Sequence, residues 1–101
     1  MKQLRIYTLK DKKSAKEYLS NHWTKHMKSL PKFGINVDNV FMEKNSLDYC
    51  RVFAIVSTEK DNLIEMNKKY MNSNDFIDDM SGFNMDNIIK VEDINLIEFY
   101  K

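Results

Sequence analysis

Five consecutive apolar residues near the middle of the chain, residues 52–56 (VFAIV), constrain the fold more than any other feature. A strand with one face in water alternates apolar and polar side chains, whereas this run presents apolar side chains to both faces. We therefore predict a strand over residues 49–56 at the centre of a sheet, with both of its faces covered.

The elements before this strand follow from hydrophobic periodicity and from the residues that break it. Residues 4–9 (LRIYTL) form a short β-rich run. A helix is expected from Ser14, which stands at capping-box spacing from Glu17, and its apolar residues recur at steps of three and four. Pro31 disrupts this helix and Gly34 closes it.

The rest of the chain repeats this alternation of strand and helix. The expected elements are a strand over residues 35–42, a helix over residues 59–72 and a short helical turn that restarts at residues 73–75. Thr58 is the expected cap of the helix, and Gly82 is expected to end the turn. Residues 88–91 and 94–100 close the chain, either as one strand broken at residues 92–93 or as two strands.

The order strand, helix, strand, strand, helix, strand predicts an α+β fold of the ferredoxin-like βαββαβ type. Such a fold has a four-stranded antiparallel sheet with both helices on one face. The 101 residues make one domain, 1–101. Because two helices cover only one face, the central strand needs a second partner, and a second copy packed sheet against sheet is the simplest one. We expect a homodimer.

Charge and cysteine content exclude several classes of function. Sixteen Lys and Arg and fifteen Asp and Glu alternate along the chain, so no concentrated basic face predicts a nucleic-acid partner. No apolar run is long enough for a membrane span or a signal peptide, and we expect a cytoplasmic protein without membrane contact. Cys50 stands alone in an apolar stretch and is expected to be a small buried residue.

His22 and His26 are the candidate catalytic residues, because both lie on the apolar face of the first helix and are expected to point toward the sheet. In one interpretation they are core residues, hydrogen-bonded to a backbone carbonyl or to Arg5 or Tyr7. In another they face a pocket, where an imidazole acts as general base or acid, Trp23 forms a wall, and Arg5 or Tyr7 orients a ligand oxygen.

A metal ion is the third interpretation of the histidine pair, since residues at i and i+4 can bind one ion. Zinc needs a third protein ligand that the local sequence does not supply, so we assign no metal and no cofactor. Arg5 has two roles open to it, an ion pair across a strand or at the dimer seam, and an anchor for a carboxylate or phosphate. Arg51 is expected at an edge or interface. The acidic pairs 78–79 and 92–93 are expected in solvated stretches, without a catalytic dyad.

A family resemblance joins several of these features. The run at residues 4–9, the W-x-x-H spacing of Trp23 and His26, the helix exit at residues 31–34 and the asparagine-containing turn before the third strand are similar to the NIPSNAP family. Many of its members carry a histidine and a tryptophan in the third strand, where this chain has residues 52–56. The resemblance implies a dimeric α/β barrel of ferredoxin-like subunits, whose relatives include cofactor-independent monooxygenases, isomerases and haem-degrading enzymes.

Two functions are therefore expected from different classes. The first is binding or transformation of a small organic molecule in a pocket between the first helix and the sheet, by a cofactor-independent monooxygenase- or isomerase-like enzyme if catalysis occurs. The alternative is a non-catalytic homodimeric interaction module. An open volume of several hundred cubic ångströms favours the first, and a packed interior favours the second.

Overall fold

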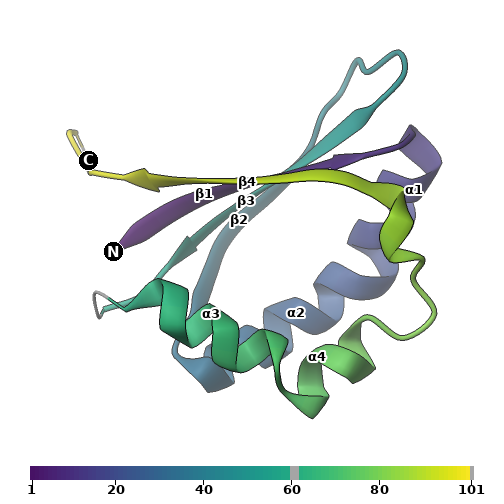
Figure 1. Ribbon diagram of the computed structural model, residues 1–101. Helices are drawn as coiled ribbons and strands as arrows, with labels where there is room; N and C mark the ends of the chain where they lie inside the picture. The colour runs from purple at the N-terminus through teal and green to yellow at the C-terminus, as the bar shows by residue number, and fades with distance from the viewer. Residues whose placement is uncertain (60–61, 101) are drawn as a thin grey trace.

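The structure, a computed structural model, describes residues 1–59 and 62–100. It contains an antiparallel four-stranded sheet in the order β2-β3-β1-β4, with helices on one face (Figure 1). The strands are β1 Lys2–Leu9, β2 Asn36–Met42, β3 Cys50–Ser57 and β4 Ile88–Leu96. The predicted α+β class and antiparallel sheet are confirmed, and this strand order is compatible with a ferredoxin-like fold.

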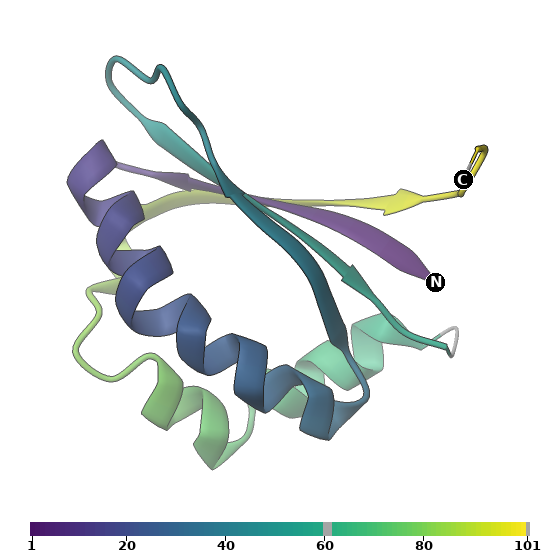
Figure 2. The same ribbon diagram turned by 180° about the vertical axis from the view of Figure 1, so that it is seen from behind.

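The helical layer has two parts, and both lie on the same side of the sheet (Figure 2). The first part runs through α1 Lys12–Glu17, the π-helical segment η1 Tyr18–Trp23, α2 Thr24–Ser29 and the 3-10 segment η2 Leu30–Phe33. The second part comprises α3 Leu63–Met71, α4 Asn74–Asp79 and the 3-10 turn η3 Met85–Asn87. No helix in the described part of the chain is long and apolar enough to cross a membrane.

The first helix starts earlier than predicted. Its cap is Asp11, whose Oδ1 accepts a hydrogen bond from the Ser14 backbone N–H at 2.7 Å. That bond lowers the pKa of the Asp11 carboxyl. The capping box at Ser14 was wrong, because an ionised carboxylate three residues upstream is a strong acceptor at a helix N-terminus. The exit was right, since Pro31 lies in the first turn of η2 and Gly34 follows that segment with φ 82° in the left-handed region.

The second helix starts later than predicted. Its N-cap position is Asn62, and the Thr58 backbone N–H donates to the Met1 carbonyl at 2.9 Å, just beyond the paired ends of β1 and β3. Residues 60–61 of the predicted helix lie outside the described residues. The helical turn is confirmed as α4, with Ser73 as its cap and Gly82 beyond its end at φ 84°.

The last strand is one continuous element, not two. Glu92 and Asp93 pair with Ile6 and Arg5 of β1 without interruption. Successive side chains of a strand point to opposite faces, so one carboxylate lies on each face of the exposed β4 edge, where neither one has to be buried. The predicted break at these two residues was wrong for this reason.

The two faces of the sheet are covered very differently. On β3, Val52, Ala54 and Val56 are fully buried under the helices, while Phe53 and Ile55 point the other way and are partly exposed. Cross-strand pairing places seven apolar side chains on that second side, which we call the open face: Leu4, Ile6, Phe41, Phe53, Ile55, Ile94 and Leu96. The central strand is therefore apolar on both sides, and this chain covers only one of them.

Candidate functional site

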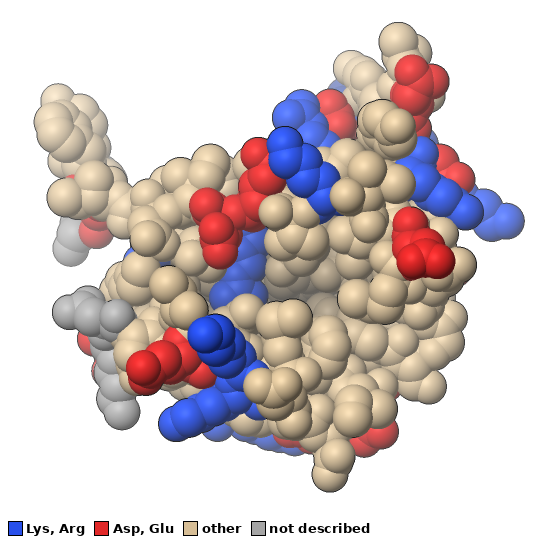
Figure 3. Space-filling model, viewed as in Figure 1, with Lys and Arg blue, Asp and Glu red and all other residues tan. Residues whose placement is uncertain are grey.

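A cavity of about 150 Å³ lies between the helices and the half of the sheet made by β1 and β4. Figure 3 shows its mouth as a hollow in a mostly uncharged surface between β4 and the helices. A volume of this order holds a group of about the size of benzene. The interior is therefore neither closed nor as open as the several hundred cubic ångströms expected for a large ligand pocket.

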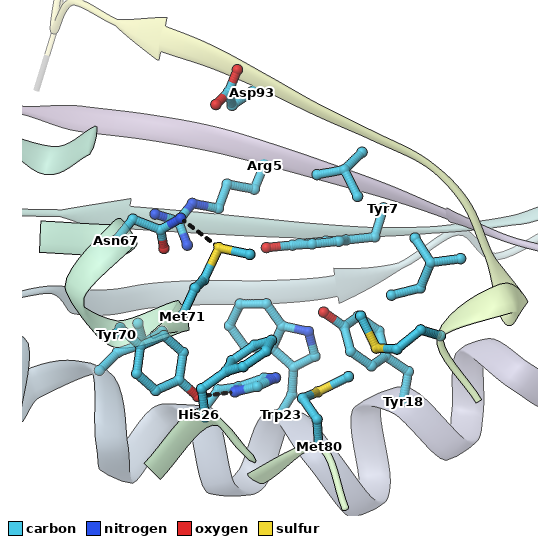
Figure 4. Close-up of a pocket in the computed structure, with 15 residues that line it drawn as sticks. Arg5, Tyr7, Tyr18, Trp23, His26, Asn67, Tyr70, Met71, Met80 and Asp93 are labelled. Atoms are coloured by element: carbon cyan, nitrogen blue, oxygen red, sulfur yellow. Dashed lines mark hydrogen bonds between the residues drawn. The ribbon is translucent and has the colours of Figure 1, made fainter. Parts of the chain in front are cut away.

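Four of the five predicted site residues meet at this cavity: Arg5, Tyr7, Trp23 and His26 line it. Figure 4 shows Arg5 and Tyr7 on the sheet side and the other two on the helix side, with Met71 reaching between them. Three widely separated parts of the sequence thus converge on one space.

His22, the fifth predicted residue, is not among the residues that line the cavity. Its Nδ1–H donates to the backbone carbonyl of Asp79 at 2.8 Å, and its ring packs against Phe83 with centroids 5.0 Å apart. The bond ties η1 to the end of α4, so the partner lies in the helical layer and not in the sheet. Of the interpretations above, the structure matches the core histidine bonded to a backbone carbonyl.

His26 is buried, with 4% of its surface exposed, and it is bonded to an unexpected partner. Its Nδ1 lies 2.5 Å from the Tyr70 hydroxyl oxygen, and that hydroxyl donates to Asp79 Oδ2 at 2.6 Å. For a core histidine we expected a backbone carbonyl, Arg5 or Tyr7 as the partner, but the partner is a side chain of α3. Tyr70 has one hydroxyl proton, which it donates in the hydrogen bond to the carboxylate. Its oxygen therefore accepts the hydrogen bond from His26 Nδ1–H.

Burial controls the protonation of this group. It lowers the pKa of His26 to about 4, although the Asp79 carboxylate at 3.8 Å opposes the shift. Burial and the same carboxylate raise the pKa of Tyr70. Near pH 7 the imidazole and the phenol are therefore both neutral, so the imidazole keeps one unprotonated nitrogen, and its lowered pKa makes it a weaker base than a free imidazole.

Arg5 is a buried cation, and no acidic partner for it lies among the described residues. It is 7% exposed, and its Nε donates to Gln3 Oε1 at 3.0 Å. In the part of the chain that the structure describes, no carboxylate lies within 4.0 Å of the guanidinium, not even that of Asp93 opposite it on β4. Because Arg5 points to the helix side of the sheet, it also lies away from the open face. Among the described residues, no carboxylate fills the ion-pair role.

An aromatic wall completes the cavity. Tyr7, Tyr18 and Trp23 meet edge to face, with centroids 5.5 to 6.1 Å apart. Burial raises the pKa of Tyr7, and the nearby Arg5 opposes that shift. The indole Nε1 of Trp23 is buried, and no acceptor among the described residues meets it with hydrogen-bond geometry. The Tyr18 hydroxyl is its polar neighbour, because an interaction with Trp23 opposes the rise that burial causes in the pKa of Tyr18.

Tyr70 and Asp79 are the residues that the sequence analysis missed as site residues. The pair at 78–79 was predicted to be solvated, whereas Asp79 is 7% exposed and bonded inside the helical layer. The prediction was wrong for Asp79 and right for Asp78, which is exposed. A signal was present, because Asp79 stands three residues after Phe76 and next to Met80, on the apolar face of α4.

The remaining candidates lie outside the cavity. Cys50 is fully buried, as predicted. Arg51 lies at the edge of the open face, paired with Glu43 at 3.0 Å and with its guanidinium 5.4 Å from the Phe53 ring centroid. Within residues 1–59 and 62–100, no group of three or more His, Cys, Asp and Glu side chains is arranged to hold a metal ion.

Comparison with known proteins adds no name to this site. No protein-family model matches the chain, and a search of the curated proteins finds no significant match.

Proposed function

We propose that this protein binds a small organic anion, and acts on it, in the cavity between the first helix and the sheet. One observation carries the proposal: Arg5 is buried at an aromatic cavity with no carboxylate within 4.0 Å in the described chain. A buried charge is costly unless it is paired. A ligand carboxylate would supply the pair, because the planar guanidinium binds two oxygens at once.

The walls of the cavity define the rest of the ligand. Tyr7, Tyr18 and Trp23 present flat apolar surface, and methionines from α3 and beyond α4 close the other side. Such walls favour a flat, largely apolar body with its polar group at one end. Small aromatic or unsaturated carboxylic acids fit this description and the volume of the cavity.

We further propose a NIPSNAP-like homodimer in which two open faces pack together as an α/β barrel. The support is the composition of the open face, where Phe41 is 52% and Ile94 is 47% exposed in the single chain. An isologous dimer would cover both sheets with one self-complementary patch. If catalysis occurs, this proposal favours chemistry without a cofactor, of the monooxygenase or isomerase type.

The experiment for the ligand compares benzoate with benzamide, its neutral counterpart of the same size. Benzoate at a hundred times its dissociation constant is expected to raise the free energy of unfolding by about 2.7 kcal/mol. Arg5→Gln is expected to weaken benzoate binding about tenfold, or about 1.4 kcal/mol, and Arg51→Gln is the matched control at an exposed arginine. Equal binding of benzoate and benzamide, or an unaffected Arg5→Gln variant, would contradict an anion site.

A non-catalytic homodimeric module is the second candidate. The small cavity volume favours it, because about 150 Å³ leaves little room beyond one ring. In that case the dimer forms, and neither benzoate nor inorganic phosphate stabilises the fold.

A further inference from the structure

We propose that Asp79 and Tyr70 hold His26 in one tautomer, so that its Nε2 removes a proton from a ligand in the cavity. This inference rests on the proposed function, because it needs a ligand in that cavity. It adds the reaction class, proton abstraction, and two positioning residues from α3 and α4.

The first step is the direction of the hydrogen bonds. Asp79 Oδ2 lies 2.6 Å from the Tyr70 hydroxyl oxygen, and a carboxylate can only accept. The tyrosine proton is therefore committed to Asp79, and its oxygen must accept from His26 Nδ1–H. The imidazole is then neutral with its proton on Nδ1 and its lone pair on Nε2.

The second step is the position of that lone pair. His26 lines the cavity, and Nε2 has no hydrogen bond in the described residues. The ring cannot easily turn, because it stacks on Phe76 at 15° and meets the Trp23 ring edge on, with centroids 5.1 Å apart. A fixed base with an unused lone pair beside a ligand space has the geometry that proton abstraction requires.

The third step is the set of charges that face His26 from the packed elements. Burial is the largest effect and lowers its pKa, Asp79 on α4 raises it, and His22 on η1 and Arg5 on β1 lower it further. Tyr70 on α3 contributes a neutral hydroxyl. The base therefore stays unprotonated well below neutral pH.

The reaction class follows from the two groups that share the cavity. Arg5 would hold the carboxylate or the carbonyl oxygen, and His26 Nε2 would take a proton from the carbon next to the carbonyl. The C–H electron pair moves to the carbonyl oxygen as an enolate, which the guanidinium stabilises. The imidazolium returns the proton to another carbon, so that the product is an isomer and no oxidant or reductant is needed. The substrate class is a small unsaturated or aromatic oxo acid.

The first test is nitrogen-15 NMR of the two imidazole side chains at pH 7. Both His22 and His26 are expected as the Nδ1–H tautomer. In Asp79→Leu the tyrosine proton loses its acceptor and turns to His26 Nδ1, so His26 changes to the Nε2–H tautomer. His22 is the internal control, because it bonds only the backbone carbonyl of residue 79. An Nε2–H tautomer for His26 in the unaltered protein would overturn the proposal without any activity measurement.

The second test uses 5-nitrobenzisoxazole, a flat probe that reports a base in an apolar cavity. Removal of its C–H proton forms a C≡N bond, breaks the N–O bond and releases a coloured phenolate. We expect turnover that is constant from pH 8 to pH 5 and falls below, toward the His26 pKa of about 4. His26→Gln should lower kcat/KM about 100-fold, the smaller end of general-base effects.

The positioning role predicts a separate signature. Asp79→Leu should lower kcat about tenfold with KM within about twofold, whereas Lys25→Gln, an exposed base on the same helix, should change neither. If His26→Gln and the unaltered protein turn the probe over equally, or neither does, His26 is not the base. Benzoate binding that survives this result would leave the ligand site standing and remove only the reaction. Loss of both would remove the proposed function as well.

Discussion

The two faces of the sheet invert the usual distribution of polar and apolar side chains. Helices of the same chain cover one face, yet a buried arginine and a buried histidine lie there beside a cavity. The open face is bare in one chain, yet it carries seven large apolar side chains. Buried polar groups and exposed apolar patches are the two departures from a plain globular surface that most often mark function.

The difference supports our proposals that one face binds a ligand and that the other packs against a second copy of the chain. On the covered face, the half under β3 is packed by fully buried residues such as Val52 and Val56, whereas the cavity with Arg5 and His26 lies at the half formed by β1 and β4. Rigid packing on one half can hold the site on the other half in place. The apolar residues of the open face are not divided into a packed half and a polar half.

The largest expected effect distinguishes the face that one chain covers by itself from the face that a second copy would cover. Leu9→Ala truncates a fully buried side chain and should lower the free energy of unfolding by about 2 to 5 kcal/mol at every protein concentration. Ile94→Ala, on the open face, should cost more as protein concentration rises, because only a dimer would bury that residue. Chemical denaturation at two concentrations measures both. If the loss of unfolding free energy in Ile94→Ala did not depend on protein concentration, the proposed difference between the two faces would be contradicted.

The polar part of the covered face should contribute to stability as well as to the site. His26→Ala leaves a small cavity and removes the partner of the Tyr70 hydroxyl, so unfolding should become easier by about 2 to 4 kcal/mol. Met27→Ala, half exposed on the same helix, is the matched control and should change little. A small effect at His26 in the denaturation midpoint would mean that the polar cluster serves the ligand alone.

A charge placed on the open face should weaken the dimer. Sedimentation at micromolar concentration is expected to give twice the chain mass of 12.1 kDa. Phe53→Asp should weaken the dimer about 100-fold, or about 2.7 kcal/mol, because a carboxylate would be desolvated at the interface. Circular dichroism should show that the covered face keeps its helices. A monomer for the unaltered chain would remove the protein-recognition role of the open face.

The smallest expected effect is a pH dependence that only the covered face should show. The pKa of His26 is about 4 in the folded chain and about 6.5 in the unfolded chain, so the unfolded state binds more protons between these values. The stabilisation is complete above pH 6.5 and decreases as pH falls, by about 2 kcal/mol between pH 7 and pH 5. His26→Gln should flatten this part of the profile in urea denaturation. The Phe53→Asp variant should keep the slope that His26 produces.

The elements were largely predictable from the sequence, and their ends were not. The spacing of apolar residues, which differs between strands and helices, located all four strands and both helical parts. Each of these signals lies within a window of about ten residues. The predicted caps at Ser14 and Thr58 were wrong, because Asp11 caps the first helix and α3 begins only after Asn62. The continuity of β4 was also missed, because the polar residues 92–93 on this edge strand resemble a turn in the sequence.

The sequence by itself determined which groups could form a site and that the central strand would be apolar on both sides. Arg5, Tyr7, Trp23 and His26 stood out as chemical types in helix and strand patterns. Only the tertiary structure decided which of them meet, and it gave His26 a partner 44 residues away in the sequence. Periodicity reports which way a side chain points relative to its own element. The partner of a buried polar group depends on how separate elements dock, and that choice follows from the packing of the whole layer.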